Sequence, residues 1–326
     1  MNTRRKLVIA IGAVTLAPLP SIAQPAARVY RIAFIGSGAA SMYANRTDGL
    51  REQLRTLGYV EGKNLTVEYA YGTGEYASLT RIAAEAVARN PDLIIASGTP
   101  AIRAVQQATK TIPVIMASAT DPIGSGFIQS LARPGGNITG LTNMTLDLSA
   151  KSYEFLRTIA PKARRIAVLM TNNPAHPASF NNMQEAAKGQ GLALTAITVT
   201  NAQQIDSSAS QMTREKIDAL LVIADPLLIS ERQRIADLAM KRRLPAVYQT
   251  SEHVDVGGLL SYGADLRGLT ARAAYYADRI FKGAKPAELP VEQPTTFELA
   301  VNLKTAQALG LKVPQSILIL ATRVIE

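Results

Sequence analysis

Short apolar runs alternate with segments of helical period along most of the chain. The run at residues 31–35 has the length of a strand, and Leu50, Leu54 and Leu57 then recur at the spacing of one helix face before Gly58. The same succession continues, with strands expected at residues 31–35, 65–69, 93–96, 113–116, 166–170, 194–199, 220–223, 246–248 and 257–263. This pattern predicts an α/β protein whose parallel sheets are covered by helices on both faces.

The two halves of the chain resemble each other. Asp92 precedes one buried run and Asp218 precedes its counterpart, while Pro113 and Pro245 open a second matching pair at a similar offset. Because 326 residues exceed the usual size of one domain, two Rossmann-like lobes are expected.

The chain is expected to cross between these lobes three times, near Gly140, Ser261 and Pro290. The crossings can act as a hinge, and they make both lobes discontinuous in sequence. The expected lobes are residues 24–141 with 262–289 (lobe 1) and residues 142–261 with 290–326 (lobe 2).

The first residues differ in kind from the rest. Positively charged residues 4–6 precede an apolar run at residues 7–19, and small residues up to Ala23 suit a signal peptidase. Residues 1–23 are therefore predicted to be a signal peptide that is cleaved near Ala23 and directs the protein to the periplasm. An uncleaved anchor is disfavoured because the apolar run is short, and twin-arginine export is a further alternative.

Composition narrows the classes of site. The chain has no cysteine, which excludes disulfides, thiolate metal sites, cysteine nucleophiles and a cysteine-linked lipid anchor. The net charge is +10, but basic residues are interspersed with acidic ones, as at Arg51 beside Glu52 and Glu231 beside Arg232. A soluble, basic monomer that does not bind nucleic acid is expected.

Polar residues follow the predicted strands at their carboxyl ends, where open parallel sheets bind ligands. Hydroxyls, amides and carboxylates at these places suit a polar small molecule held between two lobes, and tyrosines could stack on it. The candidate ligand-binding residues are Ser37, Thr99, Thr120, Asp121, Asn172, Asp225, Tyr248 and Tyr262. The same residue types also form turns and helix caps, and for Asp121, which precedes Pro122, a cap and a ligand contact are equally favoured.

Motifs for catalysis are weak or missing. The segment at residues 36–41 follows a strand, but Ser41 replaces the third glycine of a dinucleotide fingerprint. The sequence has no Gly-x-Ser-x-Gly elbow, and its two histidines, His176 and His253, lack metal-ligand spacing and are expected at the surface. No cofactor, no metal and no enzymatic activity are expected.

Five short segments together resemble a known family. They are Leu-Gly-Tyr-Val-Glu-Gly-Lys-Asn at residues 57–64, Val-Glu-Tyr at 67–69, Thr-Asp-Pro at 120–122, Pro-Gly-Gly-Asn-Ile-Thr-Gly at 134–140 and Phe-Glu-Leu-Ala-Val-Asn at 297–302. In this order they are similar to bacterial ABC-transporter substrate-binding proteins, a group with tryptophan- and tyrosine-binding members. The resemblance implies a type I periplasmic-binding-protein fold with a three-crossover hinge, a ligand in the cleft, and delivery to a membrane permease and its ATPase.

By the same resemblance, Ser37, Thr99, Thr120 and Asp121 would line one side of the cleft, and Asn172, Asp225 and Tyr248 the other. The loop at residues 172–176 departs from the small, glycine- and serine-rich loops expected there, so an amino acid or aromatic ligand is implied only loosely. A periplasmic Rossmann-like enzyme and a ligand-sensing module for a membrane receptor are the alternative functions. Asp121→Ala is expected to weaken ligand binding.

Overall fold

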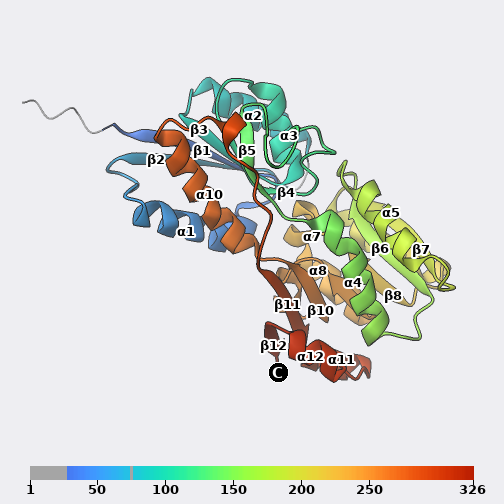
Figure 1. Cartoon of the computed structure of the whole chain (residues 1–326). Coiled ribbons are helices and arrows are strands. Elements are labelled where there is room, and N and C mark those ends of the chain that lie inside the picture. The colour runs from blue at the N-terminus through green and yellow to red at the C-terminus, as the bar shows by residue number, and fades with distance from the viewer. Residues whose placement is uncertain (1–27, 74–75) are drawn as a thin grey trace, which may run out of the picture.

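The computed structural model describes residues 28–73 and 76–326, and it shows two α/β lobes joined by several chain segments (Figure 1). The predicted signal peptide lies outside the described residues. Among the residues that are described, no helix is both long and apolar enough to cross a membrane.

The sheet of lobe 1 is entirely parallel, as predicted. Its five strands have the order β2-β1-β3-β4-β5. They are β1 (Tyr30–Gly36), β2 (Leu65–Tyr71), β3 (Leu93–Ser97), β4 (Val114–Ala119) and β5 (Ile138–Thr142). The alternation of side chains along β1 shows why helices must cover both faces, because Ile32 and Phe34 enter one apolar cluster while Ala33 and Ile35 enter another.

Two pairs of helices cover these faces. Helices α1 (Ala40–Thr56) and α10 (Leu266–Phe281) pack against each other on the side of Ile32 and Phe34. Helices α2 (Ala77–Ala88) and α3 (Thr99–Ala108) cover the opposite side. Since α10 comes after most of the second lobe in sequence, lobe 1 is built from two separate parts of the chain.

The sheet of lobe 2 is larger and mixed. Its strand order is β12-β11-β10-β9-β8-β6-β7, and β10 and β11 run antiparallel, whereas the other pairs are parallel. The strands are β6 (Arg165–Thr171), β7 (Ala193–Val199), β8 (Ala219–Val222), β9 (Ala246–Tyr248), β10 (Leu260–Ala264), β11 (Phe297–Asn302) and β12 (Arg323–Ile325). The strands after β10 were not among those expected from the pattern of apolar runs.

Helices again cover both faces of this sheet. One apolar cluster takes side chains from α4 (Thr145–Ile159), α5 (His176–Ala187), α11 (Leu303–Leu309) and α12 (Gln315–Leu320). The cluster on the opposite face takes them from α6 (Ala202–Arg214), α7 (Pro226–Ser230) and α8 (Arg232–Lys241). The short helices α9 (Glu252–Asp255) and η1 (Pro286–Glu288) complete the set.

The chain passes between the two sheets after β5, after β10 and again between η1 and β11. Hydrogen bonds join the first and the third of these passages. The amide of Thr142 donates to the carbonyl of Glu292 at 3.0 Å, and the amide of Glu292 donates to the carbonyl of Gly140 at 3.0 Å. Gly140 has a φ of 126°, and a Cβ there would lie 2.3 Å from the carbonyl oxygen of Met116. Only glycine fits this junction.

Both histidines are buried, so the expectation that they lie at the surface was wrong. His176 begins α5 and is 0% exposed, while His253 in α9 is 1% exposed. The ring of His253 stacks on Tyr248 with centroids 4.6 Å apart, and its Nδ1 lies 3.0 Å from the hydroxyl of Thr250. The histidines follow strands that the apolar pattern located, but spacing alone could not show that the loops carrying them fold inward.

Gly140→Ala is expected to lower the free energy of unfolding by about 3 kcal/mol, since the methyl group strains the backbone and collides with β4. Gly136→Ala is the matched control, because a Cβ at Gly136 meets no atom within 4 Å. Urea denaturation of both variants measures the difference. Equal stabilities would show that the junction tolerates a side chain.

The stability of the protein is expected to fall as the pH drops from 6.5 to 4.5. Burial lowers the pKa of His253 to about 4, although the neighbouring Glu252 carboxylate opposes this. The unfolded chain therefore binds the proton first, at its ordinary pKa of about 6.5, and the native state loses about 2.5 kcal/mol by pH 4.5. Urea denaturation of the wild type and of His253→Gln at pH 7 and 4.5 measures this loss, which the variant should no longer show. An unchanged pH dependence of stability in the variant would contradict the role of His253.

Candidate functional site

A small cavity lies between the two lobes, where the carboxyl ends of both sets of strands face each other. Its volume is about 30 Å³. Its polar lining consists mainly of Arg46, Thr99, Ser118, Thr120, Asn143, Asn173 and Asp225. This is the place where open α/β sheets bind ligands.

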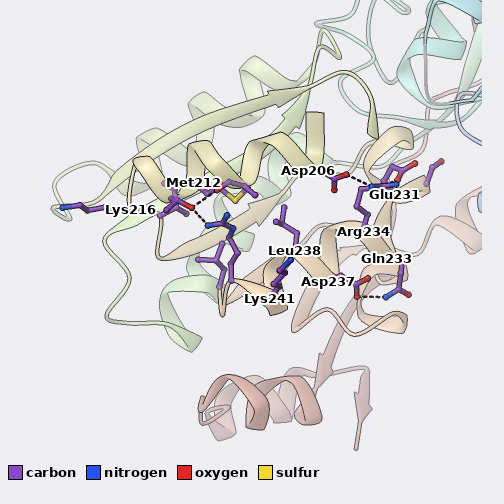
Figure 2. Close-up of a pocket in the computed structure, with 15 residues that line it drawn as sticks. Asp206, Met212, Lys216, Glu231, Gln233, Arg234, Asp237, Leu238 and Lys241 are labelled. Carbon is purple, nitrogen blue, oxygen red and sulfur yellow. Dashed lines mark hydrogen bonds and ion pairs between the residues drawn. The ribbon is translucent and has the colours of Figure 1, made fainter. Parts of the chain in front are cut away.

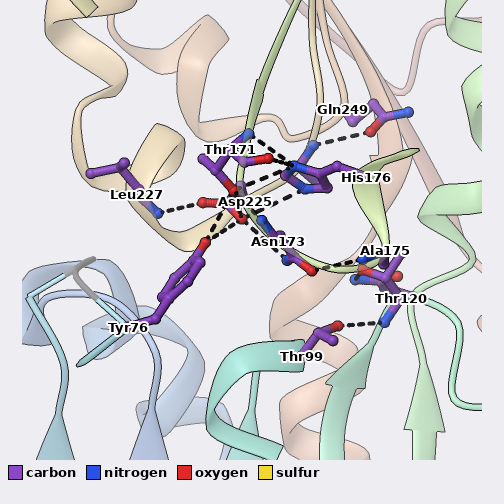
Figure 3. A network of polar contacts seen from close by, with 12 residues as sticks. Tyr76, Thr99, Thr120, Thr171, Asn173, Ala175, His176, Asp225, Leu227 and Gln249 are labelled. Carbon is purple, nitrogen blue, oxygen red and sulfur yellow. Dashed lines mark hydrogen bonds and ion pairs between the residues drawn. The ribbon is translucent and has the colours of Figure 1, made fainter. Parts of the chain in front are cut away.

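Asp225 is the centre of a hydrogen-bond network at this cavity (Figure 3). Its carboxylate is 1% exposed, and Oδ1 caps α7 by accepting from the amide of Leu227 at 2.9 Å. Oδ2 accepts from the hydroxyl of Thr171 at 3.0 Å and from the side-chain amide of Asn173 at 3.2 Å, both in lobe 2. It also accepts from the hydroxyl of Tyr76 in lobe 1 at 2.6 Å. The carboxylate thus has donors from both lobes.

His176 supports this network in a fixed tautomer. The backbone amide of Thr171 donates to Nδ1 of His176 at 2.9 Å, so the ring proton must be on Nε2. That atom lies 3.6 Å from Oδ2 of Asp225. Burial lowers the pKa of His176 despite the nearby carboxylate, so the ring stays neutral at ordinary pH and leaves the charge of Asp225 uncompensated.

Lobe 1 presents hydroxyl and amide groups on the other side of the cavity. The amide of Thr120 donates to the hydroxyl of Thr99 at 3.3 Å, and the side-chain amide of Asn143, in the chain passage that follows β5, donates to the hydroxyl of Ser118 at 3.1 Å. Thr99 is also the first residue of α3, so the positive end of that helix dipole points to the cavity. This side therefore offers hydrogen bonds and a positive potential.

Arg46 adds a full positive charge to the same side. It is 5% exposed, its guanidinium lies over the ring of Tyr43 at 5.5 Å, and it forms an ion pair with Glu252 of lobe 2. Although burial alone would raise the pKa of Glu252, the Arg46 charge lowers it below its usual value, so both partners are ionised. Arg46 also lines a groove of about 500 Å³ near β10 and α10, which shares Ile229 and Leu266 with the cavity.

Thr99, Thr120 and Asp225, three of the candidates from the sequence, line the cavity together. Ser37 lies just behind it, fully buried. Its hydroxyl donates to the carbonyl of Ser97 and accepts from the amide of Ala101, each at 3.0 Å, so it anchors the start of α3.

The other four candidates are not among the lining residues. Asp121 accepts from the amide of Gly124 at 2.9 Å in a turn, and in the described chain no helix follows it before β5, so it does not have the helix-cap role expected as the alternative. Asn172 is exposed, whereas the following residue, Asn173, is the one that enters the network. Tyr248 is buried in the lobe 2 core, and Tyr262 packs against Phe155 with ring centroids 5.0 Å apart.

Several participants are not among the candidates from the sequence, including Arg46, Tyr76, Asn143 and Asn173. Asn173 is one residue from the predicted Asn172, and Asn143 follows β5, a strand that was not predicted. Arg46 and Tyr76 have no such signal. Arg46 lies inside a helix and Tyr76 precedes one, and only the approach of the opposite lobe gives them a partner.

A larger hollow lies elsewhere on lobe 2. A groove of about 1020 Å³ separates α6 from α8 on the outer face of the lobe (Figure 2). Three of its charged side chains form ion pairs, since Arg234 bonds Asp206 at 2.7 Å and Glu231 at 2.8 Å. It contains none of the sequence candidates. Within residues 28–73 and 76–326, no cluster of three or more metal-ligating side chains occurs.

The chain is similar to known proteins that bind small molecules. The model of a family described as ABC transporter substrate binding protein matches residues 32–325. A tyrosine-binding protein of Clostridioides difficile is 27% identical over 266 residues, which are 81% of this chain and 76% of that protein.

Two solved structures are also similar to this chain. The ABC domain from Streptococcus pneumoniae in complex with L-Trp has a TM-score of 0.85 at 27% identity, and a conserved domain protein from Vibrio cholerae has 0.85 at 26%. Each match covers 91% of this chain and 100% of the other. These proteins share the type I periplasmic-binding-protein fold. The chain belongs to the ABC transporter substrate-binding protein family.

Proposed function

We propose that the protein is the extracytoplasmic solute-binding component of an ABC importer, and that it binds an α-amino acid between its lobes. Family membership supports the solute-binding role. The amino acid is suggested by the tyrosine-binding relative and by the structure solved with L-Trp.

The observation that carries the proposal is the placement of opposite charges around one cavity. Lobe 2 contributes the buried carboxylate of Asp225, and lobe 1 contributes the guanidinium of Arg46 and the start of α3. A zwitterion complements both sides, because its ammonium group can pair with Asp225 while its carboxylate accepts from lobe 1. A neutral sugar would leave the charge of Asp225 without a counterpart.

The size of the cavity links binding to a motion of the lobes. A volume of about 30 Å³ accommodates little more than a water molecule, so an amino acid enters only when the lobes move apart. We propose that the three chain passages act as the hinge for this motion. Ligand binding then shifts the population between separated and closed lobes.

The remaining parts of the proposal concern location and partners. The charged start, apolar run and small residues at residues 1–23 support export to the periplasm. A permease and its ATPase are the partners expected of the family, and they would recognise the lobes in their ligand-bound arrangement. The family is one of solute-binding proteins, and enzymatic turnover forms no part of the proposal.

Asp225→Asn is expected to weaken the binding of L-tyrosine or L-tryptophan at least about 30-fold, because a charge-assisted hydrogen bond to the ligand's ammonium is lost. Isothermal titration calorimetry of residues 24–326 measures the affinity, and a thermal melt checks that the variant is folded.

Asp121→Asn is the matched control, since Asp121 also accepts from a backbone amide near the end of a strand but does not line the cavity. It is expected to bind like the wild type. Weak binding by Asp121→Asn together with normal binding by Asp225→Asn would assign the ligand to Asp121 and contradict the proposal.

A further inference from the structure

Tyr76 is a residue of lobe 1 that bonds the central carboxylate of lobe 2. It stands at the N-cap position of α2, and its side chain reaches across to Asp225 (Figure 3). Its hydroxyl lies 2.6 Å from Oδ2 of Asp225 and 3.2 Å from the hydroxyl of Thr171. Among the described residues, the other hydrogen bonds to Asp225 come from within lobe 2.

The hydroxyl acts as a donor in this contact. Burial raises the pKa of Tyr76, and the Asp225 carboxylate raises it further, so the phenol keeps its proton. A short bond from a hydroxyl to a carboxylate is charge-assisted, and an ammonium group would make the same kind of bond to the same oxygen. Tyr76 therefore offers Asp225 what a cationic ligand group would offer.

The hydrogen bond from Tyr76 to Asp225 offsets a cost of lobe closure, which is the loss of water from a buried carboxylate. Bringing lobe 1 over Asp225 removes water from a carboxylate that is 1% exposed, and a buried carboxylate short of donors is costly. His176 is neutral and cannot balance the charge. The Tyr76 hydroxyl replaces the lost water, so the lobes can close on a satisfied carboxylate.

We propose that the Tyr76 hydroxyl competes with the ligand's ammonium group for Asp225. Without ligand, it holds the lobes in a closed arrangement in which Asp225 already has its hydrogen-bond donors. The competition rests on the proposed function, in which Asp225 binds that ammonium. A ligand must break the Tyr76 contact before it can pair with Asp225, so the apparent affinity is reduced by the population of the self-closed state. Tyr76 thereby sets a threshold of ligand concentration for binding.

The Arg46 to Glu252 ion pair is a second bond between the lobes, but it involves neither Asp225 nor Tyr76. It remains available when the Tyr76 contact is broken. Removing only the hydroxyl of Tyr76 should therefore change the balance between closed and separated lobes without abolishing closure altogether.

Tyr76→Phe tests the proposal, because it removes the hydroxyl and keeps the ring. The matched control is Tyr59→Phe, since the hydroxyl of Tyr59 also donates to a carboxylate, that of Asp278 at 3.0 Å, but within lobe 1. The chain has no cysteine, so Lys110→Cys and Lys188→Cys place one spin label on each lobe at exposed positions. Electron-spin distance measurements then report lobe separation in buffer, and calorimetry reports the Kd for L-tyrosine and L-tryptophan.

Tyr76→Phe is expected to shift the distance distribution towards separated lobes and to lower the Kd about five-fold, whereas Tyr59→Phe changes neither. A distance distribution like that of the wild type overturns the closing role of Tyr76. An unchanged or higher Kd overturns the competition. If the wild type binds neither amino acid, the proposed ligand is wrong, and the distance distributions alone decide whether Tyr76 holds the lobes together.

Discussion

The buried carboxylate of Asp225 is the constraint on which the arrangement of the two lobes depends. It lies at the end of a lobe 2 strand, where the cap of α7, the hydroxyl of Thr171 and the amide of Asn173 hold it in place. These donors satisfy the group only in part, and its charge is not balanced by neutral His176. Whatever covers Asp225 must therefore supply a further donor, and in the closed arrangement Tyr76 of lobe 1 supplies it.

The fold makes this meeting possible. Each lobe directs the carboxyl ends of its parallel strands towards the other, so loops that are far apart in sequence converge on one small volume. The three passages of the chain connect the lobes, and the hydrogen bonds of Thr142 and Glu292 hold two of those passages together. Polar groups from both lobes thus face each other without belonging to a common core.

The sequence predicted those features that depend on residues close together in the chain, namely the strands, the helices and the polar residues that follow strands. The periodicity of apolar residues located most strands and helices, and the search for polar residues after strands led to Thr99, Thr120 and Asp225, which line the cavity. The rule could not separate a residue that faces the cavity from one that turns away, which is why Asn172 was proposed where Asn173 lies at the site. Tyr248 does not line the cavity for a similar reason, because its ring belongs to the lobe 2 core.

The unpredicted residues depend on tertiary structure. Arg46 and Tyr76 acquire their partners, Glu252 and Asp225, only when the lobes meet, and no spacing along the chain encodes that contact. The antiparallel strand β11 was missed because its residues 297–302 do not continue the alternation of strand and helix. The sequence thus specifies the two lobes more directly than the surface between them.

The central claim, that the space between the lobes binds a zwitterionic amino acid, is tested most directly by a thermal-shift screen of residues 24–326. The panel contains the α-amino acids, their N-acetyl derivatives, sugars and purines. A ligand at a hundredfold excess over its Kd stabilises the native state by about 2.7 kcal/mol, which such a screen detects. The account predicts a shift with at least one free amino acid and none with its N-acetyl derivative. A shift with sugars or purines alone, or equal shifts with free and acetylated amino acids, would contradict it.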